Sequence, residues 1–571
     1  MKNLNRLLMK YPMFHNLFKK PADVIERIVA KIVTENAMVK VRAYWSSIAG
    51  LLLLSGCAAG PDYVRPATML PSAYMSDTVS VPASNGSVKN QPDSGIDKNL
   101  ESQKFIQSDI PAQWWELFQS PALSTLVEAS LKQNPTVEAA QAALRGAMEN
   151  VYAQQGAWFP SVEASYLPTR QKIAGTLASP ASSGASYYNL HTAQVSVSYT
   201  LDVFGGNRRQ IESLQAQAEA QKFQLEASYL TLTSNVVVAA IQEAALRGQI
   251  TATKEIIAIQ TQLMKMIQRQ YALGQIAQID VAAQESALAN TEVALPTLEK
   301  QLALQRDLLS ALAGRLPDGF EIESNSQPKS EPKSEPKDKS NNEHTSGLAT
   351  TIFTLDSLQL PAELPLTLPA SLVEHRPDVR AAEEQLHAAS AAIGVAVANR
   401  LPNISLGVNT YGSAASSISD LFKAGTGFWT LAGNITQPIF DGGTLKHRQG
   451  AAQAAYDQAA AQYRATVINA FQNVADALIA IQSDAVALKA AQRAERAAAK
   501  SLAIVQRQLA LGDISSANVL SSEQAYQQSR LNLVQAQAAR LTDTVALFQA
   551  LGGGWWNRNS ATVTKDMAAS K

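Results

Sequence analysis

Two stretches decide the fold of this chain: Arg-Gln-Tyr-Ala-Leu-Gly at 269–274 and Arg-Gln-Leu-Ala-Leu-Gly at 507–512. The residues after them also correspond, since Asp280 matches Asn518 without a gap. In each copy a long helical pattern runs in, glycine interrupts it, and a second helical pattern runs out. Glycine adopts the positive φ that closes a helix, and a polar side chain supports the next helix start. The copies therefore predict two long antiparallel helical hairpins that turn at these stretches.

The composition narrows the class of protein. Of 571 residues only 17% are charged and 6% aromatic, and alanine and glutamine dominate long tracts, which is typical of long helical bundles. Lys+Arg and Asp+Glu both number 48, so the charge offers no argument for nucleic acid binding. The single cysteine excludes an intrachain disulfide. No apolar run reaches the roughly 18 residues of a membrane-spanning helix, and none is predicted.

The N-terminus has the order of a secretory signal. Lys40 and Arg42 precede an apolar core at 48–54, and small residues follow. The core ends in a motif that resembles a bacterial lipobox, formed by Leu54, Ser55, Gly56 and Cys57. We therefore predict that residues 1–56 are a signal sequence and that translation starts near Met38. The alternative is a plain signal peptide with an incidental cysteine.

The remaining chain divides into two repeats and three irregular segments. The Pro-, Ser-, Asn- and Gly-rich composition at 57–112 predicts an extended tether, and the Pro/Lys/Glu-spaced insertion at 324–350 cannot form a core. Trp114 and Trp115 are interpreted as packing anchors. We expect the first repeat at 113–323, the second at 351–554, and a disordered tail at 555–571.

Each repeat is predicted to run helix, strand, loop, strand, very long helix, tip, long helix. Asn134-Pro135 corresponds to Arg376-Pro377, and Phe204-Gly205-Gly206 to Phe440 with its following glycines. The segments between them alternate apolar and small polar residues with period two, which predicts strands. The predicted strands start near 161, 195, 403 and 429, with loops at 175–188 and 412–426.

Four strands fit either a half-buried sheet of a soluble protein or part of a membrane barrel. A membrane barrel usually needs at least about eight strands, and open edges do not survive in hydrocarbon. Several chains would therefore have to contribute, and three chains would give about twelve strands.

The long helices carry a coiled-packing pattern. The helix predicted from 207 to 273 would span roughly 100 Å at 1.5 Å per residue. The second repeat shows a heptad seam, which indicates packing against neighbouring helices. The seam consists of Val467, Phe471, Val474, Leu478, Ile481, Ala485 and Leu488.

Together these features resemble the TolC-like outer-membrane efflux proteins, and within them the OprM-like lipoprotein branch of tripartite resistance-nodulation-division (RND) pumps. The resemblance covers residues 57–554 and rests on the lipobox, Gly60-Pro61-Asp62-Tyr63, Trp114-Trp115, the segment 374–379 and both tips. It implies a mainly α fold with a β-barrel portion. Three chains would form one twelve-stranded outer-membrane barrel and a periplasmic α-helical tunnel.

The resemblance also implies roles for single residues. Cys57 would carry the lipid, palmitate included, that anchors the chain to the outer membrane. A periplasmic adaptor would dock at the tips, formed by Ala272, Leu273, Gly274, Ala510, Leu511 and Gly512. Asp280, Asp513 and Asn518 would help to constrict the aperture, and helix capping is the alternative role for these three.

The implied function is a passive exit duct for drugs or toxic small molecules, with a homotrimer, an adaptor and an inner-membrane RND pump as partners. A type I protein or peptide secretion duct, a metal-efflux duct and a surface-anchored coiled-coil lipoprotein are the alternatives. No nucleotide loop, nucleophile motif or cofactor motif is found in the sequence, so no enzyme is predicted. Glu383, Glu384 and His387 have helical spacing that could bind metal, but a solvated helix face is preferred.

Overall fold

The computed structural model describes residues 59–66, 103–106, 108–172, 187–317, 352–365, 374–511 and 513–558. The lipobox with Cys57, the insertion at 324–350 and Gly512 lie outside these ranges. The chain divides into two compact units. The first combines residues up to 60 with 157–209 and 394–447, and the second holds the rest of the chain.

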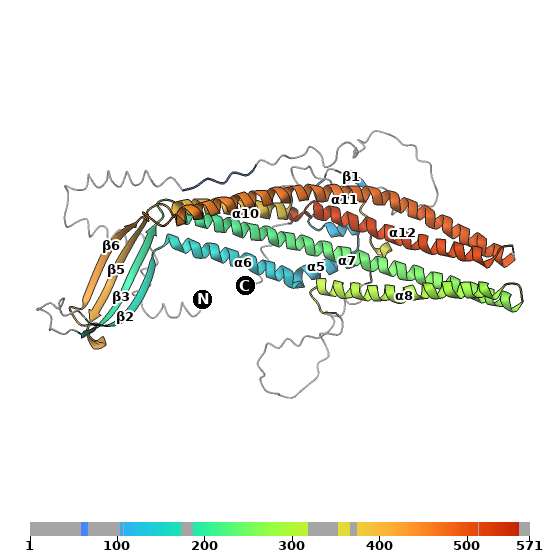
Figure 1. The fold of residues 1–571 in the computed structure, drawn as a ribbon, viewed down its shortest axis with the longest axis horizontal. Helices are drawn as coiled ribbons and strands as arrows, with labels where there is room; N and C mark the ends of the chain where they lie inside the picture. Colours follow the sequence, from blue (N-terminus) through green and yellow to red (C-terminus); the bar gives the residue numbers. More distant parts are fainter. Residues whose placement is uncertain are drawn as a thin grey trace, which may run out of the picture. The chain divides into compact units, whose positions relative to one another are not determined.

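The first unit contains a four-stranded antiparallel sheet in the order β2-β3-β5-β6 (Figure 1). Its strands are β2 (Ser161–Lys172), β3 (Tyr187–Leu201), β5 (Asn403–Ala415) and β6 (Gly427–Thr436). The register places one apolar row across all four strands, formed by Val162, Val197, Val408 and Leu431. The predicted two strands in each repeat are confirmed, and each pair lies beside the pair of the other repeat.

The first connection between strands is displaced from the predicted loop by two residues, and the second is shorter than predicted. Tyr188 pairs with Gln171, so β3 begins inside the expected first loop. In the second repeat β5 continues to Ala415, although Gly412 read as the start of a loop. A Cβ at Gly412 would lie only 2.4 Å from the Phe428 ring. The absence of a side chain at Gly412 therefore lets the Phe428 ring pack against the backbone of β5.

The second unit is built on two long helical hairpins. Its shorter helices are α5 (Pro121–Gln133), α6 (Pro135–Gln155) and α10 (Pro377–Ala398). One hairpin pairs α7 (Gly206–Ala272) with α8 (Gln278–Leu312), and the other pairs α11 (Thr444–Leu511) with α12 (Ser516–Ala550) (Figure 1). The predicted helix at 207–273 is confirmed within one residue at each end. Among the described residues α7 alone is long and apolar enough to span a membrane, and 61% of its most apolar window is buried in the protein.

The first helix of each hairpin, α7 or α11, is capped at its start by an aspartate. Asp202 accepts hydrogen bonds from the backbone N–H groups of Asn207 and Arg208, each at 2.9 Å. Asp441 accepts from Gly443 and Leu445 at 2.8 and 2.7 Å. A carboxylate satisfies free N–H groups at a helix start and also complements the helix dipole.

The core of the second unit follows the predicted seam. Five seam residues are buried, namely Val467, Val474, Leu478, Ile481 and Leu488. The paired tryptophans are packing anchors as expected, because Trp114 and Trp115 are buried and Trp114 stacks on Phe548 with ring centroids 5.3 Å apart. These aromatic side chains share one core with the seam.

Two segments that were expected to be irregular are tied to this core. β1 (Lys104–Ile106), from the expected tether, pairs in parallel with β4 (Glu363–Pro365), which precedes α10. At the other end, Trp555–Asn557 forms a short 3-10 helix. The tail predicted from residue 555 is therefore wrong for its first residues, because the two tryptophans bury apolar surface. Residues 559–571 lie outside the described part.

Candidate functional site

The first hairpin turns through Leu273 and Gly274 at the end of α7. Gly274 has a φ of +72°. Its N–H donates to the Tyr271 carbonyl at 2.8 Å, and the Gln275 N–H donates to the Gln270 carbonyl at 3.0 Å. No atom lies within 4 Å of a Cβ built at position 274. Glycine is therefore used here for its backbone conformation, which other residues adopt at a cost of about 1–2 kcal/mol.

Both turns expose leucine. The Leu273 side chain is 66% exposed and that of Leu511 is 71% exposed, and Ala272 and Ala510 are also exposed. The tip residues named from the sequence thus lie on the surface in both hairpins, apart from Gly512, which is not described. Each turn therefore presents one leucine side chain to solvent.

A small apolar cluster joins the two hairpins near their tips. Its buried members are Leu263 and Ile267 of α7, Leu502 and Leu509 of α11, and Val519 of α12. Ile276 and Ile514, from the two turns, pack against this cluster. Separating the hairpins at this end would expose the cluster to water, so the tips are held together by packing.

The three residues named for aperture constriction behave differently. The Asp280 carboxylate accepts a hydrogen bond from the backbone N–H of Ala277 at 3.3 Å, which supports the start of α8. Asp513 and Asn518 are exposed at the second turn. Helix capping therefore describes Asp280, and a role in constriction stays a prediction for all three residues.

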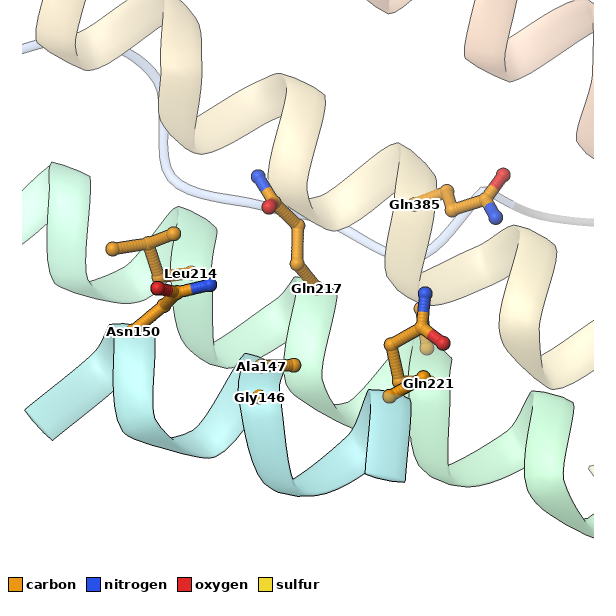
Figure 2. Close-up of a pocket in the computed structure, with 9 residues that line it drawn as sticks. Gly146, Ala147, Asn150, Leu214, Gln217, Gln221 and Gln385 are labelled. Carbon is orange, nitrogen blue, oxygen red and sulfur yellow. The ribbon is translucent and has the colours of Figure 1, made fainter. Parts of the chain in front are cut away.

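A neutral hollow lies between α6, α7 and α10. It has a volume of about 480 Å³. Figure 2 shows the amides of Asn150, Gln217, Gln221 and Gln385 around it, with Gly146, Ala147 and Leu214 completing the wall. No charged side chain lines it, so it offers polar contacts without a group suited to covalent chemistry.

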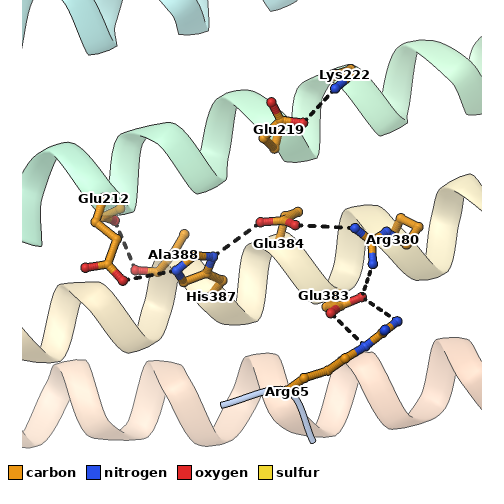
Figure 3. A network of polar contacts seen from close by, with 10 residues as sticks. Arg65, Glu212, Glu219, Lys222, Arg380, Glu383, Glu384, His387 and Ala388 are labelled. Atoms are coloured by element: carbon orange, nitrogen blue, oxygen red, sulfur yellow. Dashed lines mark hydrogen bonds and ion pairs between the residues drawn. The ribbon is translucent and has the colours of Figure 1, made fainter. Parts of the chain in front are cut away.

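Residues 61–66, which follow the lipobox, pack against α10. Figure 3 shows Arg65 reaching Glu383 of α10, with Arg65 Nε 2.9 Å from Glu383 Oε1. Tyr63 stacks on His387 with ring centroids 4.4 Å apart. The expected tether is extended here, but it is bound through an ion pair and a ring contact.

The possible metal ligands have other partners. Arg380 also donates to Glu383, at 2.9 Å, and the Glu383 side chain is buried. His387 lies between Glu212 at 3.0 Å and Glu384 at 3.4 Å (Figure 3). Among the described residues no group of three or more His, Cys, Asp or Glu is arranged to hold a metal. The predicted solvated face is wrong for Glu383, because that carboxylate is enclosed by two arginines.

The segment 374–379 joins three helices. The buried Arg376 guanidinium forms a bidentate pair with Asp378 at 2.9 and 2.6 Å. Its Nη1 also donates to the carbonyl of Ala550 at 3.1 Å, at the end of α12. The His375 carbonyl accepts from the Trp555 indole at 2.6 Å, and its ring stacks on Trp556. This motif therefore has a structural role.

Sequence reasoning missed a buried polar layer between the hairpins. It consists of Gln260 on α7, Gln284 on α8 and Glu523 on α12, which are at most 2% exposed. The signal was present, because Val519, Glu523 and Tyr526 follow the 4-3 spacing of a buried seam.

The comparisons with known proteins agree with this architecture. The family model described as "Outer membrane efflux protein" matches residues 126–315 and 368–553. The pyoverdine export outer membrane protein OpmQ of Pseudomonas aeruginosa is 26% identical over 91% of this chain and 99% of its own. The toluene efflux pump outer membrane protein TtgC of Pseudomonas putida is also 26% identical, over 89% and 94%.

Solved structures show the same fold. The outer-membrane channel OprN has a TM-score of 0.72 at 24% identity, covering 87% of this chain and all of its own. The CmeC outer membrane channel of Campylobacter jejuni has a TM-score of 0.72 at 19% identity, covering 90% and 98%. The family model covers both repeats, each with its strand pair and its long hairpin. The chain belongs to the outer membrane efflux protein family.

Proposed function

We propose that this chain is the passive exit duct of a tripartite efflux system in the outer membrane and that it acts as a homotrimer. The main support for this proposal is the sheet of the first unit, because its outer strands β2 and β6 each have one edge that no described strand of this chain pairs with. Unpaired strand edges cannot lie in lipid. Three copies of the four-stranded sheet would close a barrel of twelve strands.

The alternation of β6 supports lipid on one side of this barrel. Trp429, Leu431 and Ile435 are 75%, 67% and 70% exposed and share one face of the strand. Thr430 and Asn434 lie on the other face. Apolar residues that alternate with small polar ones fit a wall with lipid outside and water inside.

The other parts of the proposal follow from the helical unit. The hairpin tips would form a periplasmic aperture and receive an adaptor, which connects the duct to an inner-membrane RND pump. The pump would supply the energy, since the duct only conducts. Lipid on Cys57 would hold the N-terminus at the membrane. The segment around Arg65 would connect this lipid anchor to the helices.

The proposed substrates are small organic compounds. The names of relatives refer to pyoverdine and toluene export, and another relative, in Pseudomonas putida, is named for antibiotic efflux. The neutral amides around the hollow of the second unit would discriminate little among such molecules.

Docking at the tips can be tested in a host that lacks its own outer-membrane duct and expresses this chain with the adaptor and pump encoded in its genome of origin. The double variant Leu273→Asp/Leu511→Asp places a charge on each exposed turn. Val293→Asp is the matched control, because Val293 is 72% exposed on α8 but lies away from the turn.

We expect the wild type and the Val293 variant to restore resistance to toxic compounds, and the double variant to lose it at unchanged protein level. Resistance that survives both tip charges would contradict docking at the tips. A wild type that gives no resistance but restores secretion of a protein would favour the type I duct.

A further inference from the structure

The packing between the two hairpins encloses the carboxyl group of Glu523. Glu523 of α12 is 1% exposed and faces Gln260 of α7 and Gln284 of α8. Gln284 Nε2 donates to Glu523 Oε2 at 3.4 Å, and the Gln260 side chain also forms a hydrogen bond with this carboxyl. Glu523 therefore connects the second hairpin with both helices of the first.

The ionised form leaves two buried oxygen atoms without partners. Glu523 Oε1 and Gln260 Oε1 have no hydrogen-bond partner among the residues that the structure describes. A buried carboxylate without a cation is unfavourable, because it has lost its hydration. Burial accordingly raises the pKa of Glu523 to about 7, and the two amide hydrogen bonds oppose this only in part.

The charged groups of the surrounding helices do not neutralise Glu523. Arg530, about two turns along α12, is already shared by Glu255 of α7 at 3.4 Å and Glu495 of α11 at 3.9 Å. The other nearby charges on the packed helices point to solvent or to a helix end; they are Lys265, Asp280, Glu285, Arg496, Lys500 and Arg507. The polar layer thus consists of one carboxyl and two neutral amides.

Protonation would remove the buried charge from this layer. A protonated carboxyl has one O–H donor, and a glutamine amide can exchange its oxygen and nitrogen positions by rotation. The Glu523 O–H could then donate to Gln260 Oε1 while Glu523 still accepts from Gln284. This O–H bond would replace the Gln260 N–H bond to the carboxyl, and no buried charge would remain, without any movement of the helices.

We propose that Glu523 is a proton-dependent latch that holds the two hairpins together when protonated and favours their separation when ionised. The latch itself rests on the geometry of this layer. Its effect on conduction rests on the proposed function, which places the aperture at the tips. The layer and the apolar cluster around Val519 lie on the same stretch of α12, so separation there would also loosen the tips.

The direction of the pH dependence follows from linkage. A hydrated Glu523 in separated hairpins ionises near 4.5, whereas the packed one keeps its proton until about pH 7. Between these values the packed state binds more protons, so its stability falls as pH rises. From pH 5.5 to 8 the equilibrium should move toward separation by on the order of tenfold.

Amide hydrogen exchange of the full-length protein in detergent tests the latch without requiring a pore. Deuterium uptake by peptides covering 255–290 and 515–530 is compared at pH 5.5 and 8, after correction for intrinsic exchange rates. The variants are Glu523→Gln and, as a second removal of the charge, Glu523→Leu. Glu285→Gln is the control, because Glu285 is the exposed counterpart of Glu523 in the first repeat.

We expect corrected exchange to rise about tenfold with pH in the wild type and in the Glu285 variant, and to be independent of pH in both Glu523 variants. The same rise in either Glu523 variant would overturn the latch. Single-channel conductance over the same pH range separates the two proposals. Pores whose opening follows the exchange support both, whereas a pH-dependent exchange without any conductance supports the latch and contradicts the duct.

Discussion

At the scale of single residues, the buried guanidinium of Arg376 links several helices. Its guanidinium connects the start of α10 with the carbonyl groups of Ala470 in α11 and Ala550 in α12. These carbonyl groups lie in the protein interior, where a lost hydrogen bond leaves an unpaired acceptor. The residue therefore contributes to the packing of the whole second unit.

Replacement of Arg376 by alanine should destabilise the protein by about 2–5 kcal/mol, because buried acceptors and Asp378 lose their partner. The measurement is the thermal unfolding midpoint of the helical circular dichroism signal in detergent. Arg464→Ala, which removes an exposed arginine from α11, is the control and should change the midpoint little. Equal midpoints for the two variants would contradict the role of Arg376.

Gly394 packs closely against the N-terminal segment in the first unit. A Cβ at this position would lie 2.6 Å from the Ala59 carbonyl oxygen, which also accepts from Arg209 at 3.2 Å. Gly394→Ala should displace the segment and expose it to protease. Gly450→Ala is the control, since no atom lies within 4 Å of its Cβ position and alanine favours a helix.

Limited proteolysis with mass spectrometry measures this effect. Cleavage near residues 59–66 should become several-fold faster in the Gly394 variant and stay unchanged in the Gly450 variant. Unchanged cleavage in both would show that the close contact with Ala59 does not hold the segment.

The role of a single residue was predictable from the sequence where the local pattern leaves only one structural role for that residue type. Gly274 was identified because a helix that reverses needs a positive φ, and Trp114 because a paired indole needs a core. Glu383 and Glu523 were not, because their partners come from Arg65 and Gln284, hundreds of residues away. Such partners follow from the three-dimensional packing and not from local spacing.

At the scale of elements, the long helices were the most predictable part. Their bounds follow from uninterrupted periodicity and from the glycine at each tip. The strands were longer than predicted because the ladder between β3 and β5 continues through Gly412, which the sequence alone marks as a loop. The pairing of β1 with β4 was missed because three-residue strands carry no periodic signal.

The first turn provides a test at this scale. Gly274→Ala should destabilise the tip by about 1–2 kcal/mol, since alanine is unfavourable at a φ of +72° although space is available. Hydrogen exchange of residues 265–282 should therefore become about tenfold faster. Gly156→Ala, at a helical φ of −55° and with free space, should leave the same peptides unchanged.

At the scale of the whole molecule, the two repeats account for the architecture of each unit. The first unit takes two strands from each repeat, and the second takes one long hairpin from each. Within the described part of one chain the four-stranded sheet has free edges, so the account of this molecule depends on its assembly into a barrel. The duplication was readable from the sequence, whereas the number of chains was implied only by the family resemblance.

The single-channel conductance of the purified full-length protein in a planar bilayer tests this assembly most directly, with the oligomer mass determined on the same sample. We expect a trimer with small or flickering currents, which become larger when Asp280 and Asp513 are replaced by asparagine. Stable trimers that conduct no ions, even with these substitutions and with the adaptor added, would contradict a gated duct and favour a structural lipoprotein.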